Sequence, residues 1–250
     1  MYMSHYGDMY SLNSHSSMTQ EPQMTRRLHY FFDPLCGWCY AAAPLLKAAS
    51  GLIPITLHAG GMLVGAQRQQ VTPDLRDYIM QHNQRITQLS GQTFGPAHIN
   101  SLLQLEAYFD SAPPSAAILA AEQLNASGLS MLSALQQAYY REGQRITDAA
   151  ILHACAQQIG LDAAAFSSAM ASQTDAVLDA HFKQSRRKMA ELGMRGFPAL
   201  ALQTGTQWQI IDLGPFFGKP QAFQAWLQQA ASAPTSPVTA AQCSLDGCSA

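Results

Sequence analysis

The sequence predicts an α/β fold in which a strand–helix–strand unit and a strand–strand–helix unit share one sheet, with a large all-helical domain inserted between them. Three observations lead to this prediction. Apolar runs typical of strands occur near both ends of the chain, at 28–32, 54–61, 197–202 and 207–214. Between these pairs, from 72 to 188, the pattern is helical. The 250 residues, 48% of them hydrophobic, are enough for a core of this size.

The first unit begins with the apolar and aromatic run 28–32, which has the composition of a buried strand. From Cys36 onward the sequence is rich in Ala and Leu, so a helix is expected up to Gly51. Residues 54–61 form the second expected strand, closed by two glycines. Strand, helix and strand within about 35 residues make one βαβ unit, whose two strands should be parallel neighbours.

The inserted helical domain is expected at residues 66–185. Threonine followed by proline starts the first of its helices, and several helical stretches end on glycine. The sheet pattern returns at 197–202 and 207–214, which flank the turn TGT and should pair as an antiparallel hairpin before a last amphipathic helix. The sheet-bearing domain is therefore expected at residues 25–65 and 186–231.

The two ends of the chain differ from the rest. Residues 1–24 are polar and are expected to form a disordered extension, and residues 232–250 are expected to form a flexible tail. The start lacks the features of a secretory signal, and no apolar run approaches the ~20 residues of a membrane span. The net charge of −2, with 12% charged residues, leaves no basic face for nucleic acid. We expect a cytoplasmic protein that binds neither membrane nor nucleic acid.

Cys36 and Cys39 form the motif CGWC where the first predicted helix begins. Unsatisfied N–H groups and the positive end of the helix dipole stabilise a thiolate there, which makes Cys36 the expected nucleophile. Cys39 lies about one turn further on the same face, where it can attack the mixed disulfide that Cys36 forms. Structural zinc would need four ligands, which Cys243 and Cys248 could complete only at a non-standard spacing. The strand–turn–helix context favours redox chemistry, so no metal is expected.

These residues carry a resemblance to a known family. FFDPLCGWC and the distant GMRGFPAL resemble the thioredoxin superfamily, and the long helical block between them is similar to the DsbA-like branch. Within that branch, DPLCGWCY is most similar to the cytoplasmic FrnE-like predicted disulfide isomerases. The resemblance covers roughly residues 28–231. It implies a thioredoxin fold and a thiol–disulfide oxidoreductase or isomerase activity that requires no cofactor.

The resemblance also implies roles for individual residues. Cys36 matches the nucleophilic cysteine and Cys39 the resolving cysteine. The Phe197–Pro198 peptide matches the family's cis-proline bond, beside which exposed backbone holds an extended substrate peptide. Trp38, between the cysteines, could contact apolar substrates and shield the disulfide, or it could only cover a groove.

One position departs from the family pattern. Many relatives carry a buried carboxylate six residues before the nucleophile as a proton acceptor, and here that residue is Tyr30. Asp33 is nearer to the motif and is expected in the loop as a turn or cap residue. The proton acceptor for Cys39 is therefore left open, with a bound water as one candidate.

Cys243 and Cys248 form a second pair in the expected tail. The intervening SLDG is a good turn sequence, so a small-loop disulfide between them is reasonable. About eleven residues link the pair to the last helix, a reach of roughly 35–40 Å that would bring it to Cys36. The pair is either an accessory redox pair for Cys36–Cys39 or part of an idle tail.

The leading functional interpretation is a thiol–disulfide oxidoreductase, acting as reductase or isomerase on protein or small-molecule thiols and disulfides. Glutathione and thioredoxin are the candidate electron donors. The alternative is a glutathione-dependent isomerase or kappa-type glutathione transferase of the same architecture, a group that typically carries Ser where Cys36 stands. A non-enzymatic chaperone or metal-binding adaptor is the third class.

Overall fold

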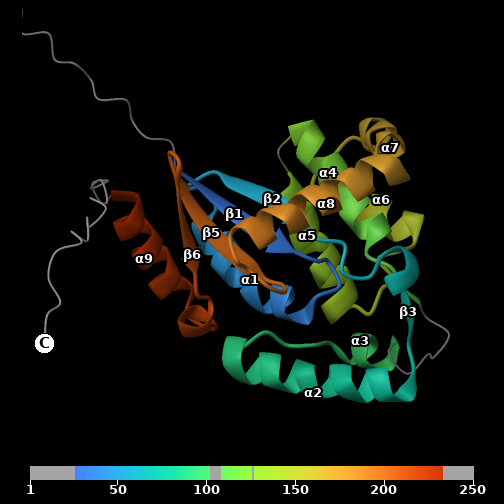
Figure 1. Ribbon diagram of the computed structural model, residues 1–250. Helices are drawn as coiled ribbons and strands as arrows, with labels where there is room; N and C mark the ends of the chain where they lie inside the picture. Colours follow the sequence, from blue (N-terminus) through green and yellow to red (C-terminus); the bar gives the residue numbers. More distant parts are fainter. Residues whose placement is uncertain (1–25, 102–107, 126, 233–250) are drawn as a thin grey trace, which may run out of the picture.

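A four-stranded mixed sheet lies at the centre of the protein (Figure 1). The computed structural model describes residues 26–101, 108–125 and 127–232. The strand order is β2–β1–β5–β6. β1 and β2 are parallel and β5 and β6 are antiparallel, as the sequence predicted, and β5 also pairs antiparallel with β1. The strands are β1 (Arg26–Phe32), β2 (Ile55–Ala59), β5 (Ala199–Thr204) and β6 (Gln207–Ile211).

β1 is a central strand covered on both faces, which explains its continuous apolar sequence. Tyr30 and Phe32 pack with Cys39 on one side of the sheet, whereas Phe31 packs with Met189 on the other. All of these side chains are buried. The alternation of side chains along the strand thus sets which residues of β1 can approach the cysteines.

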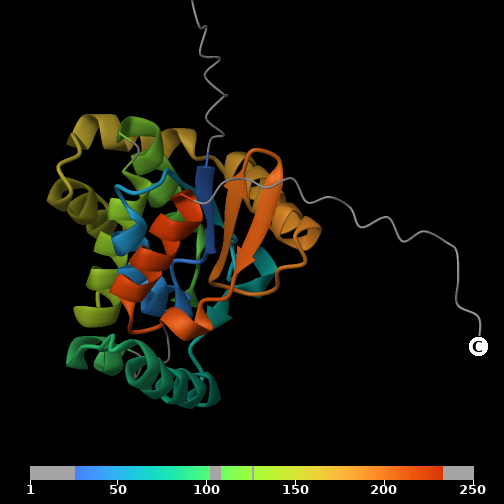
Figure 2. The same ribbon diagram turned by 90° about the vertical axis from the view of Figure 1, so that its left-hand side faces the viewer.

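Helices cover both faces of the sheet (Figure 2). α1 (Gly37–Ala49) and α9 (Pro220–Ser232) pack against each other on the face of the sheet that carries Tyr30 and Phe32. α8 (Asp175–Glu191) crosses the second face and contacts β2. The domain boundary expected between residues 185 and 186 falls inside α8, which is one continuous helix. Residues of α8 on the N-terminal side of this boundary already pack on the sheet.

The inserted segment is mainly helical, as expected. The side chain of Thr72 accepts from the N–H of Leu75 at the start of its first helix, and Gly91 ends that helix with a φ of 73°. The segment also holds a two-stranded sheet whose strands, two residues each, are too short for a hydrophobic pattern to predict. The helices are α2 (Pro73–Ser90), α3 (Pro96–Ser101), α4 (Ala112–Asn125), α5 (Gly128–Gln136), α6 (Ala149–Gln158) and α7 (Ala163–Ser172), and the strands are β3 (Gln69–Gln70) and β4 (Tyr108–Phe109).

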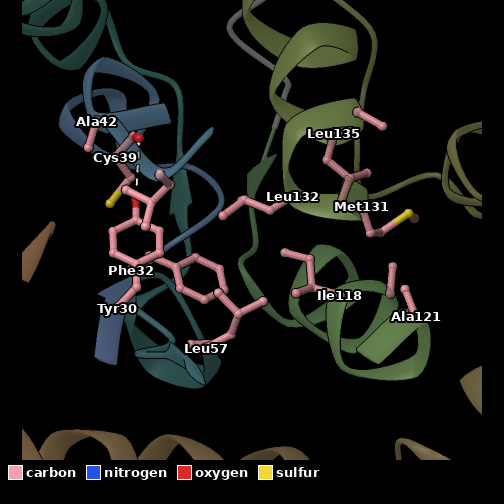
Figure 3. Packing of buried hydrophobic residues seen from close by; sticks show 14 of the residues in the cluster. Tyr30, Phe32, Cys39, Ala42, Leu57, Ile118, Ala121, Met131, Leu132 and Leu135 are labelled. Carbon is pink, nitrogen blue, oxygen red and sulfur yellow. Dashed lines mark hydrogen bonds between the residues drawn. The ribbon is translucent and has the colours of Figure 1, made fainter. Parts of the chain in front are cut away.

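The inserted helices and the sheet share one hydrophobic core (Figure 3). Phe32 and Leu57 from the sheet lie in the same buried cluster as Ile118 of α4 and Leu132 of α5. Continuous close packing of this kind fixes the insertion relative to α1. Side chains from the insertion can therefore be held in place beside the CGWC motif. In the described part of the chain, no helix is long and apolar enough to cross a membrane.

Candidate active site

Cys36 is the N-cap residue of α1. Its backbone is extended, with φ −83° and ψ 113°, and its carbonyl accepts from the N–H groups of Cys39 and Tyr40 as the helix begins. Cys36 is 7% exposed and Cys39 is fully buried, and both are free thiols. The N–H of Cys36 donates to the carbonyl oxygen of Asp33 at 3.1 Å, and helix α1, whose first N–H groups lack intrahelical partners, begins at the next residue.

The segment Phe197–Pro198 lies against Cys36, although 161 residues separate Phe197 from the cysteine. The Phe197–Pro198 peptide bond is cis, and the carbonyl oxygen of Phe197 accepts a hydrogen bond from Sγ of Cys36 at 3.4 Å. A Cβ atom on Gly60 would lie 1.9 Å from Cζ of Phe197, so a glycine after β2 makes room for this ring. The two distant motifs of the sequence therefore meet at one place.

The two cysteines stand in different environments. Burial raises the pKa of the Cys39 thiol well above its usual range, and its contact with Cys36 raises that pKa further. Cys36 instead lines a cavity that opens beside the motif. A substrate sulfur can reach Cys36 directly, whereas Cys39 must lose a proton inside the protein before it can react.

Asp33 is a buried carboxyl group, and the turn or cap role expected of it accounts for only part of its contacts. Its Oδ1 does accept from the N–H of Leu35 at 3.0 Å, as a turn residue would. Oδ1 also accepts from Oγ of Ser111 at 2.8 Å, and Oδ2 accepts from the N–H of Met62 at 2.6 Å. Burial raises the pKa of Asp33, and these hydrogen bonds oppose that rise. The sequence did not reveal this because Ser111 covers the carboxyl from the inserted segment.

Tyr30 occupies the position where relatives often carry the proton acceptor. Its hydroxyl donates to the carbonyl oxygen of Cys39 at 3.3 Å (Figure 3). Burial raises the pKa of Tyr30 well above its usual range, so the hydroxyl stays a donor. Tyr30 ties the first turn of α1 to β1 and is not a proton acceptor.

Trp38 lies half-buried under the inserted helix α2. Its Nε1–H donates to Nδ1 of His82 at 3.3 Å, and the guanidinium carbon of Arg85 lies 5.9 Å from the centroid of its ring. The ring of Phe217 lies on another side, 5.6 Å away between centroids. Nothing in the sequence pattern marked His82 or Arg85, because both occupy an ordinary amphipathic helix.

A cavity of about 750 Å³ opens beside Cys36. Its walls come from the start of α1, the loop after β2, helix α2 and the chain around Tyr140. A second hollow of about 410 Å³ lies along Pro198, and Trp38 and Phe197 line both spaces. The two rings thus divide the surface around the cysteine into two neighbouring sites. A cavity of this size beside a thiol can receive a small-molecule disulfide.

The remaining residues that the sequence singled out lie elsewhere. His29 and His58 hydrogen-bond each other at 2.9 Å, and His58 stacks on Phe31, so both lie on the sheet face away from the cysteines. Cys155 is buried in α6, as expected of a packed residue. Cys243 and Cys248 lie outside the described residues. Among the residues that the structure does describe, no three His, Cys, Asp or Glu side chains gather as a metal site would require.

A helix-start thiol, a buried partner thiol one turn away and an adjoining cis-proline segment on this sheet define a thiol–disulfide oxidoreductase with a thioredoxin fold. The chain belongs to the DSBA-like thioredoxin domain family, whose model matches residues 27–213. The DsbA-like resemblance inferred from the motifs is thereby confirmed.

The chain is also similar to solved structures. The chain is 43% identical to the cytosolic disulfide reductase DsbM from Pseudomonas aeruginosa, with 82% of this chain and 98% of that chain covered and a TM-score of 0.76. A structure of the same protein with GSH has a TM-score of 0.73, with the same identity and coverage. A 2-hydroxychromene-2-carboxylate isomerase shares the fold at 17% identity, with 82% of this chain and 97% of that chain covered and a TM-score of 0.50. No curated protein matches the chain.

Proposed function

We propose that this protein is a cytoplasmic reductase of protein and small-molecule disulfides that works through the CGWC dithiol and is recharged by glutathione. The observation that carries the proposal is the unequal placement of the two thiols, with Cys36 on an open cavity and Cys39 fully buried. The protein is similar to a relative described as a cytosolic disulfide reductase, whose structure was also solved with GSH. This similarity supports reduction of the substrate as the direction of electron flow and glutathione as the electron donor. Placement in the FrnE-like branch, and thioredoxin as a second donor, remain predictions.

In the first step, the thiolate of Cys36 attacks one sulfur of a substrate disulfide. A bond forms between Sγ of Cys36 and that sulfur, the substrate S–S bond breaks, and the other substrate sulfur leaves as a thiolate. The Phe197 carbonyl, which accepts from the Cys36 thiol at rest, gives up that hydrogen bond when Cys36 ionises. Backbone on either side of Pro198 is then available to an extended substrate peptide.

In the second step, Cys39 resolves the mixed disulfide. Its proton passes to the carboxylate of Asp33, whose backbone N–H also hydrogen-bonds the Cys39 thiol. The new thiolate attacks Sγ of Cys36, the Cys36–Cys39 disulfide forms, and the reduced substrate leaves. Asp33 suits this role because it is buried and because burial raises its pKa toward that of a useful base.

Two glutathione molecules complete the cycle. The first attacks the Cys36–Cys39 disulfide at Cys36 and forms a mixed disulfide, and Cys39 regains its proton. The second attacks the glutathione sulfur, releases oxidised glutathione and restores the Cys36 thiol. Electrons therefore flow from two glutathione thiols to one substrate disulfide, and no metal or organic cofactor takes part.

The test is glutathione-driven reduction of insulin and of a small disulfide by the full chain. We expect Cys36→Ser to abolish both reactions, and Cys39→Ser to accumulate a mixed disulfide at Cys36 that mass spectrometry detects. Cys155→Ser is the matched control, since this buried thiol lies in α6. Turnover that survives the loss of Cys36 would refute the proposal.

The equilibrium potential of the Cys36–Cys39 pair against glutathione tests the direction. A pair that glutathione reduces readily supports a reductase or isomerase, whereas a pair that stays oxidised in an excess of reduced glutathione rejects glutathione as the donor. Glutathione conjugation that survives loss of Cys39 would instead support the transferase alternative.

A further inference from the structure

Tyr140 is a buried phenol beside the active site that the cycle described above does not use. It is 3% exposed, and its hydroxyl oxygen is buried with no hydrogen-bond partner among the residues that the structure describes. Buried hydroxyls are normally satisfied, so one without a partner needs an explanation. Tyr140 also lines the same 750 Å³ cavity as Cys36.

The surrounding chain holds the phenol ring in a fixed position. Tyr140 belongs to the π-helical turn Gln137–Arg141, and such turns are frequent at functional sites. Its ring stacks on that of Tyr40, with centroids 4.7 Å apart and planes inclined by 15°. The carbonyl oxygen of Tyr140 accepts from the N–H of Gly95 at 2.9 Å. Because Tyr40 directly follows Cys39, the stack sets the phenol relative to the cysteine pair.

The hydroxyl lies within electrostatic reach of the reacting groups. Burial raises the pKa of Tyr140 well above its usual range, and charges on Cys36 and Cys39 raise it further. The phenol therefore stays protonated in the working pH range and can act only as a neutral hydroxyl. It can donate a hydrogen bond without losing one to the protein.

We propose that the Tyr140 hydroxyl donates a hydrogen bond to the sulfur that leaves when Cys36 attacks a small aliphatic disulfide in the cavity. The inference rests on the proposed function. Attack is in line, so the leaving sulfur lies beyond the attacked sulfur, away from Cys36 and inside the cavity. Negative charge develops on that sulfur, and a hydroxyl with no other hydrogen-bond partner in the described residues can stabilise that charge in the transition state. The Phe197 carbonyl, which also contacts Sγ of Cys36, is an acceptor and cannot do this.

The substrate class follows from the same argument. Disulfides of aliphatic thiols such as glutathione release a basic thiolate, which gains most from a hydrogen-bond donor. The aromatic disulfide DTNB releases an acidic thiolate that leaves readily without help. The effect of Tyr140 on the rate should therefore depend on the basicity of the leaving thiolate. A residue with a purely structural role would affect all disulfides alike.

The experiment measures the first step alone in a Cys39→Ser background. Quenched-flow mass spectrometry follows the adduct at Cys36 with glutathione disulfide, 2-hydroxyethyl disulfide and DTNB. We expect Tyr140→Phe to slow the two aliphatic disulfides about tenfold and DTNB less than about twofold, as for loss of one hydrogen bond to a charged atom. The melting temperature should stay unchanged or rise, because the substitution removes an unsatisfied buried hydroxyl.

Tyr40→Phe is the matched control. It makes the same chemical change in the other ring of the stack, and it removes the hydrogen bond from Tyr40 to the carbonyl of Thr93 at 3.1 Å. It should lower the melting temperature and leave the ratio of the three rates unchanged. If Tyr140→Phe slowed adduct formation equally with all three disulfides, or did not slow it at all, the inference would be overturned. A wild-type chain that reacts with none of them would overturn the proposed function instead.

Discussion

A Cβ atom on Gly37 would lie 2.9 Å from Cδ1 of Ile86, so helix α2 of the insertion rests directly on the dipeptide between the two cysteines. Gly37 is the first residue of α1 and Ile86 is 1% exposed. Gly37 is not among the glycines with positive φ, so the chain needs a glycine here for packing and not for backbone conformation. The identity of the CGWC dipeptide is thus matched to the insertion above it.

This contact predicts a coupled pair of substitutions. Gly37→Ala should lower the free energy of unfolding by about 1 kcal/mol, because overpacking outweighs the gain in helix propensity. Ile86→Val removes Cδ1 and should cost about 1 kcal/mol alone. In urea unfolding, the double variant should be about 1 kcal/mol more stable than the added effects of the two single substitutions would give. Strict additivity would contradict direct contact between the two positions.

Gly60 offers a similar test next to the cis-proline segment. Gly60→Ala places a methyl group 1.9 Å from Cζ of Phe197, so the ring must move and its carbonyl must shift from Cys36. We expect a loss of roughly 2 kcal/mol in stability and at least about tenfold in disulfide reduction. Phe197→Leu in the same background lacks Cζ and should recover most of the stability. Failure of the second substitution to recover it would place the clash elsewhere.

Asp33 should affect the second chemical step more than the first. Asp33→Asn removes the proposed proton acceptor, and we expect resolution of the mixed disulfide to slow by about 100-fold while formation at Cys36 changes little. Rapid quench at several pH values separates the two steps.

Ser111→Ala is the matched control for Asp33. It removes one hydrogen bond to the carboxyl, so it should destabilise the fold by about 1 kcal/mol but leave the resolving step within about threefold of wild type. Equal slowing of resolution by both variants would show that Asp33 acts only by holding the loop.

The histidines on the far face of the sheet predict a loss of stability in acid. Burial lowers the pKa of His58 from 6.5 to about 3, and His29, His181 and Lys188 around it act in the same direction. Between these values the unfolded chain binds a proton that the folded chain does not, so the free energy of unfolding falls as pH falls from about 6.5 to 3. The full shift corresponds to a decrease in the free energy of unfolding on the order of 5 kcal/mol.

Urea unfolding at a series of pH values measures this slope. His58→Gln keeps a polar partner for His29 but does not titrate, and it should flatten the curve between pH 6 and 4. An unchanged slope in that variant would assign the acid sensitivity to other groups.

Much of the fold could be predicted because it depends on local pattern. The run Leu28–Phe32, the helix start at Cys36 and the hairpin from residue 199 to 211 were all expected within a few residues of their observed bounds. Strands β3 and β4 were not expected, because two-residue strands have no period. The boundary placed at residue 185 fell inside α8, because helical pattern does not tell which layer a helix covers.

The sequence by itself determined the chemistry of the site. A C-x-x-C motif after a strand and at a helix start supplies an attacking and a resolving thiol, because backbone N–H groups and helix spacing are set by local structure. Tertiary structure alone decided what surrounds those thiols. Ser111 covers Asp33, α2 rests on Gly37 and a π-helical turn holds Tyr140 at the cavity. Such contacts depend on how distant segments pack together, which no short stretch of sequence specifies.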